Sequence, residues 1–157
     1  MIQRIQSVFL AVSAVVTALF AFLTFASFEV NGNIYYMKVL GLYYQDTSEV
    51  LFEAPNMSLS AVALFGILLS VSAIFQYKNR TTQLRLVSLG IVAQLASIAL
   101  VFFATSFVPE ALFEGTIPQI NYKWVSFLPV CSVVFMVLAM RAIKKDEALI
   151  KSLDRIR

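Results

Sequence analysis

The sequence contains no histidine and a single cysteine, and both shortages exclude chemistry. Histidine is the side chain that most often serves as a general base or as a transition-metal ligand. The lone cysteine, Cys131, excludes an intramolecular disulfide, and we expect it to pack as a small apolar residue. The chain also has no phosphate-binding loop, dinucleotide-binding glycine pattern or zinc-ligand spacing. We therefore expect no enzyme activity, no cofactor and no metal site.

Charged residues are scarce as well, at 13% of the chain, whereas 60% of the residues are hydrophobic. A soluble domain of this length needs more polar surface to cover its core. A helix needs about 20 apolar residues to cross the hydrocarbon of a bilayer. Four stretches come close to that length: about 5–28, 57–77, 86–107 and 124–141. The sequence predicts an all-α membrane protein, a four-transmembrane-helix bundle that forms a single domain over residues 1–157.

The basic residues outside these stretches lie mostly on one side of the predicted membrane. Lysine and arginine are enriched in the cytoplasmic segments of membrane proteins. Ten of them lie before the first stretch, between the second and third, and after the fourth, against two on the other side, Lys38 and Lys123. This distribution predicts that both termini are cytoplasmic, and that the loops 28–56 and 108–123 face outward.

The outer loops allow two interpretations. Asn31-Gly32 is a typical hairpin turn between two apolar segments, which indicates a small β-structured cap. The alternative, which we favour, places the loop aromatics at headgroup level as an interfacial belt with Tyr122 and Trp124. Three carboxylates match no known calcium loop and are expected to form a solvated acidic face: Asp46, Glu49 and Glu53. The aromatics offered as candidate partner contacts are Tyr35, Tyr36, Tyr43 and Tyr44.

Apart from Arg141 at the end of the fourth, the predicted spans contain no aspartate, glutamate, lysine or arginine, although ion and proton pathways usually need such a residue. Gln94 is the most polar residue near the middle of a span. It is a candidate for an interhelical hydrogen bond, and less so for the lining of a substrate route. Pro129 is expected to kink the fourth helix and to free the carbonyl of Val125.

Small residues recur at helical spacing in three of the stretches. Close approach along such residues drives helix association in lipid, so we expect them to pack the four helices together. They are Ser7, Ala11, Ala14, Ala18 and Ala21 in the first stretch, Ala63, Gly66, Ser70 and Ala73 in the second, and Gly90, Ala93, Ser97 and Ala104 in the third.

The tail, 142–157, is predicted to be a cytoplasmic amphipathic helix that continues the fourth span. Its apolar face includes Leu149, Leu153 and Ile156, and lysines and arginines flank that face. Such a segment docks on an anionic leaflet or on a cytoplasmic partner.

The two ends of the chain carry a family resemblance. The opening residues, Met-Ile-Gln-Arg-Ile-Gln-Ser, and the tail from Arg141 to Arg157 resemble an uncharacterised family of four-span proteins from Bacteroidota, domain of unknown function 4293. Ile150-Lys151-Ser152 departs slightly from the Val-Arg-Ser that is frequent in that family. The resemblance implies a bacterial inner membrane and a four-span plan, and it implies no activity.

These observations favour a non-enzymatic accessory or scaffold subunit of an inner-membrane complex. The alternative is a small oligomeric transporter or channel component whose path runs near Gln94. As partners we expect the lipid bilayer, other membrane subunits or further copies of the chain, and no nucleic acid.

Overall fold

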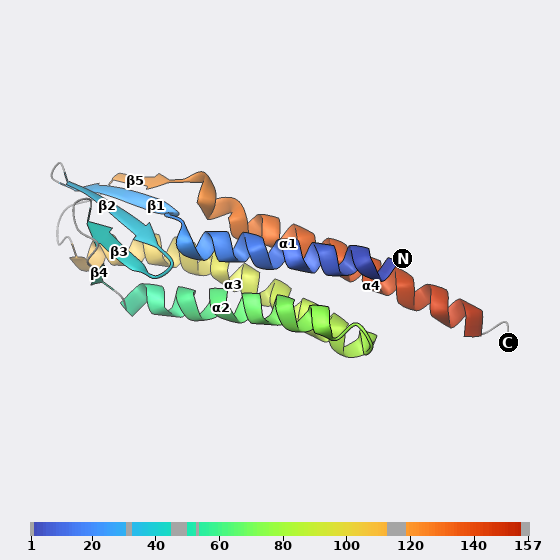
Figure 1. Cartoon of the computed structure of the whole chain (residues 1–157). Coiled ribbons are helices and arrows are strands. Elements are labelled where there is room, and N and C mark those ends of the chain that lie inside the picture. Colours follow the sequence, from blue (N-terminus) through green and yellow to red (C-terminus); the bar gives the residue numbers. More distant parts are fainter. Residues whose placement is uncertain (1, 31–32, 45–49, 53, 113–118, 155–157) are drawn as a thin grey trace.

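A helical bundle with a small sheet at one end makes up the computed structural model, which describes residues 2–30, 33–44, 50–52, 54–112 and 119–154 (Figure 1). The helices are α1 (Ile2–Phe22), α2 (Ala54–Phe75), α3 (Arg80–Leu112) and α4 (Leu128–Asp154), and a short 3-10 helix, η1 (Trp124–Phe127), leads into α4. The strands are β1 (Ala26–Val30), β2 (Asn33–Lys38), β3 (Gly41–Tyr44), β4 (Val50–Phe52) and β5 (Gln119–Tyr122).

The four helices alternate in direction, and each packs against its neighbours in sequence, with α1 also against α4 (Figure 1). The sheet lies at one end of the bundle, which we call the sheet end. Both chain termini lie toward the opposite end, which we call the terminal end. Each helix contains a window long and apolar enough to cross a membrane: Ile5–Phe22, Met57–Phe75, Arg80–Phe107 and Trp124–Ile150. The predicted class, mostly helical with four such helices, is confirmed.

The first apolar stretch is shorter as a helix than predicted. We expected a span to about residue 28, but α1 ends at Phe22 and β1 begins at Ala26. Along β1, Phe28 and Val30 are buried and Glu29 between them is exposed, which is the period of two of a strand. Hydropathy alone does not separate the end of a span from a buried strand that follows it.

The strands form one antiparallel sheet in the order β4-β3-β2-β1-β5. Asn31 and Gly32 lie outside the described residues, but Val30 pairs with Asn33 on either side of them, so the predicted hairpin is confirmed. The four tyrosines lie in β2 and β3, so the outer loop forms the β-structured cap that we ranked second. Their position at the headgroup level of a membrane stays a prediction. The buried face of the sheet packs on the helices through Phe28, Met37 and Leu42.

Three expectations for the fourth helix are wrong. Pro129 lies in the first turn of α4, where a proline has no helical hydrogen bond to lose, so no kink is required. The carbonyl of Val125 accepts a hydrogen bond from the N–H of Leu128. Cys131 is exposed, because the buried face of α4 passes through its neighbour Ser132.

The small residues pack as expected on two of the three helices. All four on α2 and all four on α3 are buried, and these two helices pack on each other. On α1 the expectation is wrong: Ala11 is exposed and the other four are only half-buried. The buried face of α1 holds polar residues instead, Gln6, Ser13 and Thr17. These side chains need hydrogen-bond partners, and facing the other helices provides them.

Candidate functional site

Four fully buried polar side chains meet inside the bundle and form the central polar cluster: Ser13, Thr17, Gln94 and Ser132. They come from α1, α3 and α4. Gln94 Nε2 donates to Thr17 Oγ1 at 2.8 Å, so Gln94 makes an interhelical hydrogen bond. Ser132 Oγ lies 2.7 Å from Ser13 Oγ and 3.0 Å from Thr17 Oγ1. The cluster thus joins three of the four helices.

Each hydroxyl hydrogen of the cluster has an acceptor. Thr17 donates to the carbonyl of Ser13 at 2.9 Å, so Ser132 is the donor to Thr17 and Ser13 is the donor to Ser132. No hydroxyl hydrogen remains for Gln94 Oε1, which is buried and has no partner among the described residues. The remaining helix, α2, packs closely against the Gln94 amide. A Cβ atom on Gly66 of α2 would lie only 2.8 Å from Gln94 Nε2.

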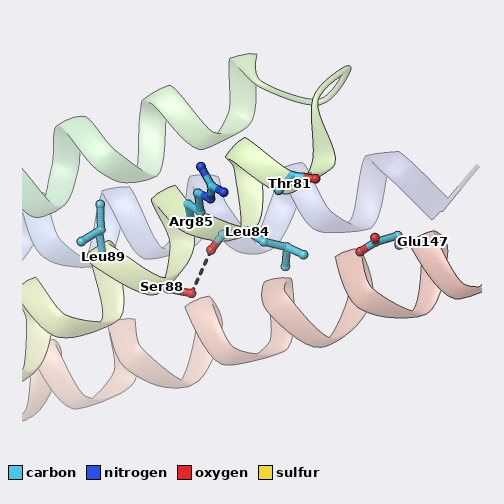
Figure 2. A pocket seen from close by; sticks show the side chains of 6 residues that line it. All are labelled: Thr81, Leu84, Arg85, Ser88, Leu89 and Glu147. Atoms are coloured by element: carbon cyan, nitrogen blue, oxygen red, sulfur yellow. Dashed lines mark hydrogen bonds between the residues drawn. The ribbon is translucent and has the colours of Figure 1, made fainter.

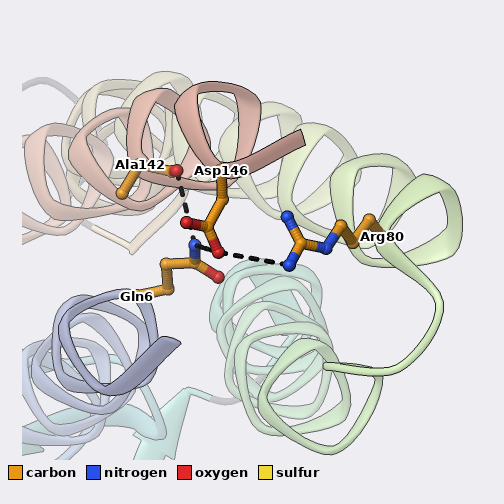
Figure 3. A network of polar contacts seen from close by, with 4 residues as sticks. All are labelled: Gln6, Arg80, Ala142 and Asp146. Carbon is orange, nitrogen blue, oxygen red and sulfur yellow. Dashed lines mark hydrogen bonds and ion pairs between the residues drawn. The ribbon is translucent and has the colours of Figure 1, made fainter. Parts of the chain in front are cut away.

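A second network, the terminal network, lies at the terminal end and consists of Gln6, Arg80, Ala142 and Asp146 (Figure 3). Asp146 Oδ2 pairs with Arg80 Nη2 at 3.3 Å and accepts from Gln6 Nε2 at 3.1 Å. Gln6 Nε2 also lies 3.3 Å from the carbonyl of Ala142. The Asp146 side chain is 11% exposed and that of Arg80 is 20% exposed, so this ion pair is largely shielded from solvent. This ion pair joins α3 to α4, and the hydrogen bond from Gln6 joins α1 to the same carboxylate.

Sequence reasoning missed the terminal network, because the predicted fourth span ended at 141. A signal was present in the spacing of α4. The buried positions Ser132, Met136, Ala139 and Ile143 recur every three or four residues, and the next position in that series is Asp146. Arg80 gave no comparable signal, since it lies between two other basic residues, Lys78 and Arg85, in the segment that joins the second and third predicted spans.

The sheet brings the four candidate tyrosines together but divides them between its two faces. Tyr35 pairs with Tyr44 and Tyr36 with Tyr43 across β2 and β3. Tyr35 packs against the buried core that contains Phe28. Neighbouring residues of a strand point to opposite faces, so Tyr36 and Tyr43 lie on the face away from that core.

Both lysines of the outer loops lie on that second face of the sheet. Lys123 Nζ lies 4.8 Å from the ring centroid of Tyr36, and Lys38 Nζ lies 4.8 Å from that of Tyr43. A cation at this distance is attracted to the ring face. We call Tyr36, Lys38, Tyr43 and Lys123 the tyrosine–lysine face.

The tail continues α4 as one helix to Asp154 and extends beyond the other helices (Figure 1). Leu149 and Ile150 are exposed there, at 47% and 45%. Ile156 lies outside the described residues, as do Asp46, Glu49 and Glu53, and the side chain of Leu153 is not described.

A comparison with protein-family models matches residues 2–156 to the family described as Domain of unknown function (DUF4293). No match is found among curated proteins, and none among solved structures.

Proposed function

The chain belongs to the DUF4293 family, and on that premise we propose that it is a non-enzymatic accessory or scaffold subunit of a protein complex in a bacterial inner membrane. The observation that carries this proposal is the central polar cluster. Its four side chains are fully buried, and its hydroxyl groups bond to one another or to backbone. The polar groups in the middle of the bundle therefore serve to hold helices together, which leaves the outer surfaces for function.

The outside of the bundle supports the proposed membrane placement. Every helix exposes large apolar side chains, among them Val15 at 58%, Leu64 at 59%, Val92 at 61% and Val134 at 53%. Exposed apolar surface on this scale suits lipid or another protein. In this placement the sheet end is outside and the terminal end is cytoplasmic, as the distribution of lysine and arginine favours.

Two surfaces extend beyond the proposed spans and suit protein partners. The tyrosine–lysine face combines aromatic rings with cations, and tyrosine is enriched at protein interfaces. The end of α4 extends past the other helices (Figure 1), and Leu149 and Ile150 are exposed in its last two turns. Because that part continues the axis of α4, it is better placed to contact a cytoplasmic subunit than to lie flat on the leaflet.

Isolation of the complex tests the scaffold role. The full chain, purified from native membranes in a mild detergent, is expected to retain other membrane subunits that mass spectrometry identifies. Tyr36→Ala with Tyr43→Ala should reduce this retention, and so should Leu149→Ser with Leu153→Ser and Ile156→Ser. Tyr77→Ala is the matched control, since Tyr77 is an exposed tyrosine far from the sheet. If the double tyrosine variant and the triple tail variant both retain the other subunits as well as the unmodified chain does, the scaffold role is contradicted.

Labelling of single cysteines tests the orientation. In a Cys131→Ser background, cysteines at Glu29 and Asn121 should react with a membrane-impermeant maleimide in intact cells. Cysteines at Lys78 and Lys144 should react only after permeabilisation. The reverse pattern would place the sheet in the cytoplasm and overturn the orientation.

One observation favours a second candidate, a small oligomeric transporter or channel component. Gln94 Oε1 is a buried acceptor that has no partner among the described residues, and such a group can bind a passing polar solute. Under this alternative, Gln94→Leu abolishes the growth phenotype of the chain, whereas the tyrosine variants leave it intact. Under the scaffold role, the tyrosine variants impair growth and Gln94→Leu does not. All variants are compared at matched expression.

A further inference from the structure

One edge of the sheet carries backbone groups that have no partner among the described residues. In the order β4-β3-β2-β1-β5, the two edge strands are β4 and β5. The pairing of β4 with β3 contains a register shift, whereas β5 pairs with β1 in an unbroken register. Irregular pairing and charged residues are the usual protections of an edge strand. The four residues of β5, Gln-Ile-Asn-Tyr, show neither.

The hydrogen bonds between β1 and β5 show which backbone groups of β5 point outward. In an antiparallel pair, alternate residues exchange hydrogen bonds with the neighbouring strand, and the residues between them point away from it. The N–H of Lys123 donates to the carbonyl of Phe25 at 2.9 Å. Two residues earlier, Asn121 likewise turns its backbone groups toward β1. Ile120 and Tyr122 therefore turn theirs to the outer edge, where these groups bond to no described residue.

The outer edge of β5 lies outside the apolar windows of the helices. The window of the fourth helix begins at Trp124, after β5 has ended. Gln119, Asn121 and Tyr122 are exposed. Unpaired backbone groups are costly in lipid, but water solvates them, and a partner strand that replaces this water gains a row of hydrogen bonds.

We propose that the outer edge of β5 binds an extended, antiparallel segment of another subunit, with an acidic side chain opposite Lys123. The backbone of that segment pairs with the outward N–H and C=O groups of Ile120 and Tyr122. The side chains of these two residues lie on the core face of the sheet, and Tyr122 is 47% exposed there, so apolar partner residues suit the positions opposite them. This inference rests on the proposed accessory role and gives the form of the partner.

The lysine at the end of β5 selects an acidic partner. Lys123 has an extended backbone, with φ −93° and ψ 159°, which continues the line of the strand. Its Nζ lies 4.8 Å from the ring centroid of Tyr36, on the face away from the core. A partner residue opposite Lys123 forms a non-hydrogen-bonded pair, in which the two side chains approach closely. Opposite charges stabilise such a pair, and like charges destabilise it.

The direction of β5 argues against a second copy of the chain as the occupant. β5 runs along the length of the bundle and leads through η1 into α4 (Figure 1). Two β5 strands paired antiparallel would therefore point their bundles in opposite directions. The distribution of lysine and arginine favours one orientation in the membrane, which excludes that pairing.

A groove between α3 and α4, near the terminal end, differs from this edge (Figure 2). It is lined by Thr81, Leu84, Arg85, Ser88, Leu89 and Glu147. Its Ser88 hydroxyl donates to the carbonyl of Leu84 at 2.9 Å, and Glu147 also interacts within the chain. Two polar side chains of the groove are thus already engaged, whereas both outward residues of β5 keep unpaired backbone groups.

Amide exchange at single residues tests the edge. The full chain in detergent micelles is measured by NMR with and without the peptide acetyl-Glu-Val-Thr-Val-Thr-amide, whose glutamate falls opposite Lys123. Without the peptide, Asn121 and Lys123 should be protected, and Ile120 and Tyr122 should exchange freely. At about ten times its Kd, the peptide should slow exchange at Ile120 and Tyr122 about tenfold and leave Asn121 unchanged.

Changes of charge test the acidic partner. Lys123→Gln should raise the Kd of the peptide about threefold, the effect of one exposed ion pair. A peptide with lysine in place of its glutamate should bind more weakly still, because like charges then face each other. Lys78→Gln is the matched control, since Lys78 is an exposed lysine beside a tyrosine ring at the terminal end.

Unchanged exchange at Ile120 and Tyr122 in excess peptide overturns the site, and equal binding of the two peptides overturns the acidic partner. Protection of these two amides that needs no peptide and rises with the concentration of the chain would give the edge to a second copy. The same amides, measured in the complex from native membranes, separate the two proposals. Subunits retained without protection of Ile120 and Tyr122 disprove the strand pairing alone. A chain that retains no subunit but binds the peptide disproves the accessory role and keeps the edge.

Discussion

The sheet end buries an apolar core, whereas the helical bundle buries a polar cluster beside its own apolar residues. At the sheet end, a core of apolar residues such as Phe25, Phe28 and Met37 fills the space between the sheet and the helices. In the middle of the bundle, polar side chains from three helices meet inside, while Leu64 and Val92 are exposed outside.

In the proposed membrane placement, two solvents act on one chain: water at the sheet end and lipid around the helices. Apolar burial stabilises the sheet because water surrounds a cap of this kind. In the proposed membrane placement, the helices gain nothing from hiding leucine from lipid, so hydrogen bonds and close packing hold them instead. Substitutions in the two regions should therefore destabilise the protein in different ways.

The largest effect is expected from Phe28→Ala. This residue is 1% exposed, and truncating a buried phenylalanine costs about 4 kcal/mol through lost contacts and a cavity. Hydrogen exchange in detergent should show that β1 and β2 lose protection while the middle of the helices keeps it. Phe127→Ala, at a phenylalanine that is 66% exposed, is the control. Equal loss of protection in the helices would mean that sheet and bundle are one cooperative unit.

Gly66→Leu should destabilise the bundle by about 3 kcal/mol, because added side-chain atoms force packed helices apart. The first added atom would already lie 2.8 Å from Gln94 Nε2. Denaturant unfolding in micelles, followed by helical circular dichroism, measures the change. Ala61→Leu tests specificity, because Ala61 is an exposed residue of the same helix. If both variants are equally stable, the close approach of α2 to Gln94 is not a constraint.

Asp146→Ala should cost about 2 kcal/mol, because it leaves the shielded Arg80 without its counter-charge. The combination of Arg80→Leu and Asp146→Leu should recover part of this loss, since it removes both charges together. The same micelle unfolding assay measures both proteins, with the exposed Lys145→Ala as control. A double variant no better than Asp146→Ala would mean that the ion pair adds nothing of its own.

Gln94→Leu has the smallest expected effect, about 1 kcal/mol or less, which is typical of one interhelical hydrogen bond in a membrane protein. The loss is limited because Gln94 Oε1 has no partner to lose among the described residues. Gln76→Leu, at an exposed glutamine that follows α2, is the control in the same assay. A loss of several kcal/mol would mean that the central polar cluster acts as one network.

Much of the bundle could be predicted from the sequence, but the buried face of α1 could not. Hydropathy located all four helices, and small residues located the contact between α2 and α3. On α1 the small-residue pattern predicted the wrong buried face, because Ser13 and Thr17 are buried and Ala11 is exposed. Their partners, Gln94 and Ser132, lie far away along the chain, and no local pattern reports such a pairing.

The sequence by itself determined the four apolar helices, the hairpin about Asn31-Gly32 and the family of the chain. These depend on local hydropathy, on turn chemistry and on residues that stand next to one another. Only the tertiary structure decided that Asp146 meets Arg80, that Tyr36 and Tyr43 share a face with both outer lysines, and that Arg85 and Glu147 line one groove. Each of these depends on how helices and strands from distant parts of the chain are rotated and placed in register against one another.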